Sequence, residues 1–219
     1  METNEVDLKI FMNLRRLKEI KRCNNFPVLN QEDVAQHSFY VTLLAMFIAN
    51  EYNAWAFENN MKYHPLDADN TYKVARVNVI IEQALAHDLE ESFTSDIPWN
   101  IKHMKEVHTV LTEAINQRID SIFENSKNMK LYRNMNKFCK HGFEGRFVEL
   151  ADMLELAIYC WEEKAKGNHF LQPMLDKCIN LLQSMDEYGT MLKASSLFKS
   201  LMELIKSDSI KAETLLDIN

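Results

Sequence analysis

Two histidines and two aspartates interrupt apolar helical patterns at three places in the sequence. His37 falls on the apolar side of one helical pattern, the pair His87 and Asp88 follows another, and Asp152 interrupts the run "RFVELADMLELAIYCW". Burial of such groups costs free energy unless they are paired or bound to a cation. Two neutral imidazoles and two carboxylates would give a divalent metal site of nearly zero net charge. Because no thiolate is offered, this donor set favours manganese, iron, cobalt, nickel or zinc.

Each of these residues also has an ordinary structural explanation. Taken alone, His37 is explained as a core histidine with one hydrogen-bonding partner. His87 and Asp88 fit a helix end close to solvent, and Asp152 can pair with a lysine or cap a neighbouring helix. The metal hypothesis depends on the coincidence of all four, because a helical bundle can bring side chains from separate helices to one buried point.

The periodicity of the apolar residues predicts helices along most of the chain. Only 4 glycines and 4 prolines occur in 219 residues, whereas a β-rich fold uses more of both in its turns. No repeat, low-complexity block or linker divides the chain. We therefore predict an all-α fold with a single domain over residues 1–219 and its functional motifs within 14–167. The expected helices span about 6–21, 32–52, 71–91, 100–124 and 145–166, with one or two more over 170–206.

The composition argues against several classes of protein. A formal net charge of −7 does not suit strong, nonspecific nucleic-acid binding, although a small phosphorylated ligand stays possible. The 4 cysteines form no CxxC pair, which argues against a zinc ribbon or redox pair and favours free thiols. The segment "METNEVDLKIFMNLRR" does not resemble a secretory signal, and no uncharged apolar run is long enough to span a bilayer. We expect a cytoplasmic protein without a membrane partner.

The order of the polar residues resembles the H…HD…D pattern of HD-domain phosphohydrolases, and longer segments resemble the bacterial 5′-deoxynucleotidase branch. "EDVAQHSFYVTLLAMFIA" is similar to that branch's "ENVAEHS…VA…A" segment, "HDLEESFTSDIPWNIK" to "HD..E..TGD.P…K", and "RLKEIKRC" to "RL..I.RW". "LADMLELAIY" resembles its last ligand helix. A bare His-Asp pair is a weak indication. HDxxE followed by T-x-D-x-P, with V-A-x-H-S upstream, is specific.

The resemblance covers residues 14–167 and implies an HD-domain helical bundle with one divalent transition metal at its centre. The metal ligands that it implies are His37, His87, Asp88 and Asp152.

The same resemblance implies roles for acidic, basic and aromatic residues around the metal. Glu91 matches the catalytic glutamate of the family, and Asp96 matches a second acid that helps to position or activate the attacking water. Arg22 matches an arginine that contacts the substrate phosphate or sugar, and Lys102 falls near a family lysine. Trp99 is a candidate for stacking on a base, with a buried structural aromatic as the alternative.

The sequence departs from the family pattern at three positions. Cys23 replaces the tryptophan that follows the arginine, and if that ring shapes the sugar pocket, the resemblance does not imply a preference for deoxyribose here. Ser95 replaces the glycine before the second acid. Gln36 replaces the acidic residue before His-Ser, so any carboxylate that supports the metal ligands from that position is lost.

The function implied by the resemblance is metal-dependent hydrolysis of a nucleotide, in the first place a dNMP to a deoxynucleoside and phosphate. Hydrolysis of a dNTP with release of triphosphate stays open, because it uses the same metal site and a different pocket depth. Two alternatives of other classes are a non-catalytic nucleotide-binding HD module and a purely structural bundle. The intact set of ligands, with Glu91 and Asp96, argues against both. A homodimer or higher homo-oligomer also stays open.

Overall fold

The computed structural model describes residues 3–59, 74–97, 101, 104–124, 126, 128, 142–184 and 189–206. Within these ranges the regular structure is helical, apart from one isolated antiparallel bridge between Lys21 and Asp33. The predicted all-α fold is therefore confirmed. None of the helices described is both long and apolar enough to cross a membrane. The single domain over residues 1–219 stays a prediction.

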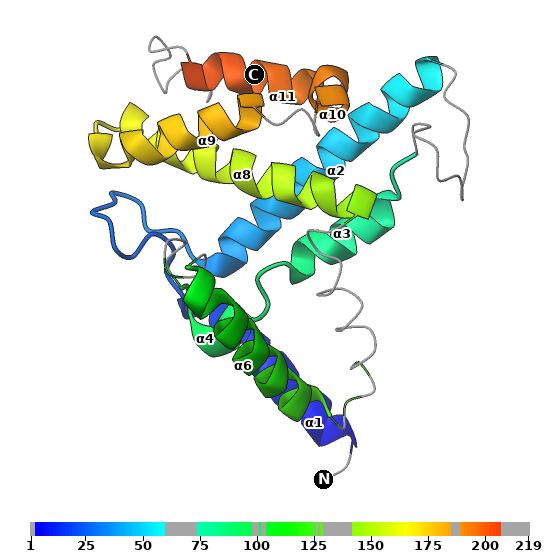
Figure 1. Cartoon of the computed structure of the whole chain (residues 1–219), viewed down its shortest axis with the longest axis vertical. Coiled ribbons are helices and arrows are strands. Elements are labelled where there is room, and N and C mark those ends of the chain that lie inside the picture. The colour runs from blue at the N-terminus through cyan, green and yellow to red at the C-terminus, as the bar shows by residue number, and fades with distance from the viewer. Residues whose placement is uncertain are drawn as a thin grey trace, which may run out of the picture.

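Three helices form the centre of the molecule and enclose its main apolar core. Helix α2 (Val34–Glu58) packs against both α3 (Val77–Ala86) and α8 (Gly142–Ala165), and α3 also contacts α8. Figure 1 shows α2 and α8 crossing in the body of the molecule, with α3 beside them. Fully buried core side chains from the three helices include Ile48, Tyr52, Ile80, Phe147 and Leu154.

A second group of helices packs around a smaller core. It comprises α1 (Thr3–Leu14), the 3-10 helix η1 (Arg15–Glu19), α4 (Glu91–Thr94) and α6 (Lys105–Phe123). In Figure 1, α1 and α6 run side by side away from the body, and they also contact each other. Their shared core contains Ile10, Ile119 and Phe123. This group places η1 and α4 next to the N-terminus of α2.

The last described helices cover one side of the α2–α8 pair. Helix α9 (Gln172–Ser184) follows the 3-10 helix η2 (His169–Leu171) and packs on α8. Helices α10 (Gly189–Ala194) and α11 (Ser196–Lys206) lie against α2. Glu51 of α2 accepts hydrogen bonds from the Ser195 and Ser196 hydroxyls and from the backbone N–H of Leu197, which satisfies donors at the start of α11.

Several predicted helix boundaries were wrong. The first helix ends at Leu14 and continues as η1, whereas α2 extends to Glu58 rather than about residue 52. The predicted third helix, 71–91, ends as α3 at Ala86, because the chain turns tightly there through backbone bonds from Leu89 N to Ala86 O and from Glu91 N to Asp88 O. The predicted starts at 71 and 100 lie outside the described residues, but residues 74–76 are not helical and α3 begins only at Val77.

Candidate metal centre

The structure brings His37, His87, Asp88 and Asp152 together at the junction of α2, α3 and α8. His37 Nε2 lies 3.2 Å from His87 Nε2, 3.1 Å from Asp152 Oδ1 and 3.5 Å from Asp88 Oδ2. His87 Nε2 is 3.2 Å from the same Asp88 oxygen. Both imidazoles are buried, and Asp152 keeps the largest side-chain exposure of the group at 24%. Each side chain comes from an element that the core packing fixes.

These separations match the edges of a metal coordination shell. Metal–ligand bonds of about 2.0–2.2 Å place adjacent ligand atoms roughly 3.0–3.5 Å apart. The ligand atoms of His37, His87 and Asp152 all lie within 4.8 Å of one another, and Asp88 adds its own contacts to both imidazoles. The donor set therefore fits one divalent ion. The assignment of these residues as ligands stays a prediction.

The second nitrogen of each imidazole is held by a hydrogen bond. His87 Nδ1 lies 2.6 Å from the carbonyl oxygen of Ala84, so the Nδ1–H donates there and leaves Nε2 free to accept a cation. His37 Nδ1 lies 2.6 Å from Glu155 Oε2. Both imidazoles thus point Nε2 toward the shared centre.

Two glutamates that had no role predicted from the sequence, Glu155 and Glu32, lie behind His37 together with the predicted Arg22. Glu155 Oε2 lies 3.1 Å from Arg22 Nη1, which is also 3.4 Å from Glu32 Oε2 and 2.6 Å from His37 Nδ1. Glu155 follows Asp152 by three residues on α8, so the two share a helix face. A carboxylate one turn after an expected ligand is the signal that could have identified it.

Electrostatics in this group depend on the crowding of carboxylates around one guanidinium. Burial lowers the pKa of Arg22, but the charges of Glu155, Asp152 and Asp88 outweigh burial and raise it above its usual range. Burial, followed by the charge of Glu155, raises the pKa of Glu32 to about 7. Burial and Arg22 lower the pKa of His37, yet hydrogen bonds to Asp152 and Glu155 prevail and raise it to about 9. The site attracts positive charge, as a cation site must.

Residues 9–201 match the 5′-deoxynucleotidase YfbR-like family. The chain belongs to this family. It is therefore a hydrolase that acts on phosphoric ester bonds, and both the family and the reaction class predicted from the sequence are confirmed. No curated protein matches the sequence significantly.

Solved structures of low sequence identity share the fold. An HD-domain phosphohydrolase from Listeria innocua has a TM-score of 0.64 at 21% identity, over 91% of this chain and 97% of that chain. A protein from Pyrococcus horikoshii OT3 has a TM-score of 0.65 at 18% identity, over 90% and 99% of the two chains. The HD phosphohydrolase of cyanophage S-2L, bound to dA and one catalytic Zn²⁺ ion, has a TM-score of 0.52 at 17% identity, over 89% and 95%. These likenesses show the HD-domain fold.

The two acids expected from the 5′-deoxynucleotidase resemblance flank the short helix α4. Glu91 is its first residue and is buried, whereas Asp96 follows its end and is half-buried. Between helix and Asp96, Ser95 adopts φ 63° and ψ 171°. Glycine reaches this conformation without a steric penalty and serine does not, which explains the family's glycine at this position. The catalytic roles of Glu91 and Asp96 stay predictions.

The predicted substrate residues are only partly described. Arg22 lies behind His37 in contact with Glu155 and Glu32, and its predicted contact with substrate is untested. Cys23 is half-buried next to it, and burial raises the pKa of its thiol to about 11, with a smaller upward effect from Asp96. Trp99 and Lys102 lie outside the described residues.

The segment that carries Arg22 and Glu32 is fixed at both ends and in the middle. Its ends pair through bonds from Arg22 N to Glu32 O and from Val34 N to Ile20 O, each 3.0 Å. In the middle, the backbone N–H groups of Leu29 and Asn30 donate to Glu163 of α8 over 2.6 and 2.9 Å. Asn168 Nδ2 also donates to Glu163 Oε2 and to Pro27 O. The carboxylate of Glu163 thereby anchors this loop on α8.

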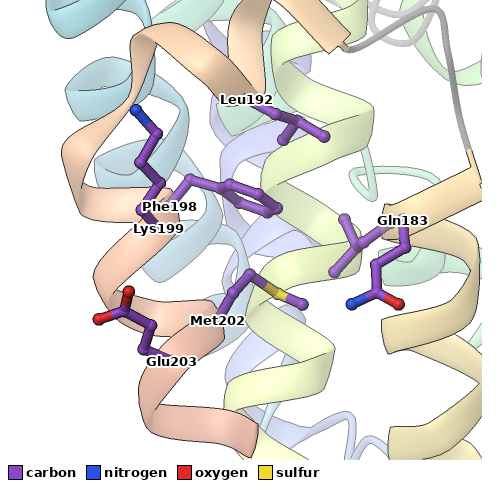
Figure 2. Close-up of a pocket in the computed structure, with 7 residues that line it drawn as sticks. Gln183, Leu192, Phe198, Lys199, Met202 and Glu203 are labelled. Carbon is purple, nitrogen blue, oxygen red and sulfur yellow. The ribbon is translucent and has the colours of Figure 1, made fainter.

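A pocket between α9, α10 and α11 lies apart from the polar centre. Figure 2 shows Leu192, Phe198 and Met202 directed into it, with Gln183 on the opposite wall and Lys199 and Glu203 along α11. None of the lining residues belongs to the metal centre or its charged neighbours.

Proposed function

We propose that the protein is a metal-dependent 5′-deoxynucleotidase that hydrolyses a dNMP to a deoxynucleoside and phosphate. The observation that carries the proposal is the set of separations of 3.1 to 3.5 Å among donor atoms of His37, His87, Asp88 and Asp152. Membership in the 5′-deoxynucleotidase YfbR-like family supports this substrate class. The nitrogen and oxygen atoms of these four side chains fit a cation. A purely structural bundle gives no reason to bury four polar residues at one point.

A divalent metal held by these residues would act as a Lewis acid toward a phosphoryl oxygen and would acidify the attacking water. The two imidazoles contribute no charge when neutral, and the carboxylates of Asp88 and Asp152 balance the charge of the ion. Arg22 stays cationic, because its pKa is raised, and can offset negative charge on the phosphate. Because Arg22 lies behind His37, it would have to give up a contact with Glu155 or Glu32 to contact the substrate phosphate.

Glu91 is the group proposed for proton transfer. Hydrolysis breaks the bond between phosphorus and the 5′ oxygen, forms a bond to the water oxygen, and moves one proton from the water to the leaving alkoxide. Glu91 is buried and follows Asp88 by three residues, so its carboxylate could accept that proton from the water and pass it to the leaving oxygen. Asp96 is the alternative for this role, or acts by orienting the water.

The solved phage enzyme supports a deoxynucleoside pocket and a metal of the zinc class. It has a similar fold and holds dA with one catalytic Zn²⁺ ion. The choice between a monophosphate and a triphosphate depends on pocket depth, and the choice of sugar on the surroundings of Cys23, where the family pattern has tryptophan.

The proposal is tested by phosphate release from a panel of dNMPs, NMPs, dNTPs and ppGpp with Mn²⁺, Co²⁺, Mg²⁺ or EDTA. We expect phosphate from dNMPs with a transition metal and no activity with EDTA. Triphosphate release from dNTPs, with dNMPs inert, would assign the alternative reaction. Bound metal and nucleotide without turnover of any substrate would indicate a binding module.

A further inference from the structure

We propose that Glu155 is a positioning residue for the metal site, which holds His37 in the tautomer and orientation that a metal requires. The inference rests on the proposed function, because it needs His37 to be a ligand. Glu155 hydrogen-bonds to His37 Nδ1 and to Arg22 Nη1, and its effect on the metal passes through the imidazole of His37.

The geometry of His37 divides its two nitrogens between two groups of partners. Nε2 faces the proposed ligands, at 3.1 Å from Asp152 Oδ1 and 3.2 Å from His87 Nε2. Nδ1 faces Glu155 Oε2 at 2.6 Å. His37 is 0% exposed and Glu155 4%, so solvent does not replace the carboxylate as acceptor. A proton kept on Nδ1 leaves the lone pair of Nε2 for the cation.

Because Arg22 can also donate to His37 Nδ1, a carboxylate that accepts the Nδ1 proton is needed to fix the tautomer. Its Nη1 atom lies 2.6 Å from His37 Nδ1, so the guanidinium could donate to an unprotonated Nδ1. That arrangement would place the imidazole proton on Nε2, where it would block metal binding. Glu155 Oε2 accepts from both Arg22 Nη1, at 3.1 Å, and His37 Nδ1. An anionic oxygen shared by two N–H donors favours the tautomer that binds metal.

The residue that directly precedes His37 does not supply its carboxylate partner. In the family pattern an acidic residue precedes His-Ser, and here that residue is Gln36. Gln36 is exposed and forms a capping box with Asp33: its N–H donates to Asp33 Oδ1, and its Oε1 accepts from Asp33 N. It therefore contributes to the start of α2. The carboxylate at His37 comes from α8 instead, one turn beyond Asp152.

The test measures Co²⁺ binding to apoprotein by the visible absorption of the bound ion, so that the result does not depend on activity. Glu155→Gln keeps the size of the side chain and removes its charge, and we expect the dissociation constant to rise about 10–100-fold. Glu155→Asp keeps the charge and should bind more tightly than Glu155→Gln. Equal affinity of Glu155→Gln and the wild type would overturn the proposal.

Glu32→Gln is the matched control. It removes a half-buried carboxylate that is 3.4 Å from the same Arg22 atom, whereas the 2.6 Å bond to His37 Nδ1 belongs to Glu155. We expect its Co²⁺ affinity to change much less than that of Glu155→Gln. An equal loss in both variants would mean that only the net charge of the group matters, and would refute positioning through Nδ1.

A measurement on the wild type covers the case in which Glu155→Gln does not fold. Nitrogen NMR of the zinc-loaded protein should show His37 protonated at Nδ1 and bound to metal at Nε2. A proton on Nε2 would contradict the inference even if the protein binds zinc elsewhere. Wild-type protein that binds neither Co²⁺ nor Zn²⁺ would instead refute the proposed metal site itself.

Discussion

Helix α8 carries two buried glutamates, Glu155 and Glu163, in different electrostatic surroundings. Glu163 accepts from two backbone N–H groups and from the amide of Asn168, and these hydrogen bonds outweigh burial and lower its pKa. Glu155 lies beside a second carboxylate, Glu32, whose pKa burial and the charge of Glu155 raise to about 7. The carboxylate of Glu163 is satisfied by neutral donors. The carboxylate of Glu155 depends on Arg22 and on the imidazole of His37.

The difference separates a structural anchor from a site built to hold charge. A carboxylate satisfied by fixed neutral donors stabilises the fold in any state of the active site. A cluster of carboxylates with too few cations is unfavourable until a further cation arrives, which is the condition that a metal site requires. Substitutions in the two regions should therefore change different measurable quantities.

Asp88→Ala should remove bound metal and activity together. The variant loses a carboxylate that contacts both imidazoles, at 3.5 Å from His37 Nε2 and 3.2 Å from His87 Nε2. Loss of a residue that only supports a ligand costs up to about 100-fold in metal affinity. Loss of a ligand itself should therefore lower the affinity by more than about 100-fold. Elemental analysis and the phosphate assay measure both losses. Wild-type metal content in the variant would place the ion elsewhere.

Glu91→Ala should keep metal and nucleotide but lose turnover by about 10²–10⁴-fold, because it removes a proton-transfer group. The assay needs kcat from the phosphate release of metal-loaded protein, with metal content measured on the same sample. Asp96→Ala is the companion variant. An active Glu91→Ala with an inactive Asp96→Ala would reverse the two roles, and two active variants would leave activation of water to the metal.

Glu163→Gln should lower the free energy of unfolding by about 2 kcal/mol at pH 7, because an oxygen that accepts from N–H groups is replaced by an NH₂ group that cannot accept. Metal affinity should stay unchanged. The folded-state pKa of Glu163 is below the ordinary 4.5, so its stabilising effect is present above that pH and is lost as pH falls through the folded value. Urea unfolding at pH 7 and at acid pH should show a shallower decline in the variant. Loss of metal with no change in stability would show that Glu163 is not a structural anchor.

Ser95→Gly should raise the free energy of unfolding by about 1 kcal/mol, since serine at φ 63° and ψ 171° carries a backbone penalty that glycine avoids. The measurement is urea unfolding at neutral pH, with Ser92→Gly within α4 as the control expected to destabilise. Equal destabilisation in both variants would show that Ser95 is unstrained.

Local sequence patterns were sufficient to predict the helical class, the family and the residues that meet at the polar centre. Apolar periodicity is local, and it places His37 and Asp152 on the inner faces of their helices. The order of His37, His87, Asp88 and Asp152 carries the family pattern without any knowledge of contacts. The early end of α3 at Ala86 was not predicted, because the turn at His87 keeps nearly helical angles and no glycine or proline marks it.

The surroundings of His37 result from tertiary packing and could not be predicted from local sequence. Glu155 is 118 residues away from it, and Glu163 is 134 residues away from its partner Leu29. Both glutamates lie on the same helix with similar burial, so local pattern does not distinguish them. Their roles differ because packing of α8 on α2 brings one against an imidazole and a guanidinium, and the other against free backbone N–H groups of a loop. A carboxylate's function is set by the donors within reach, and folding alone brings those donors together.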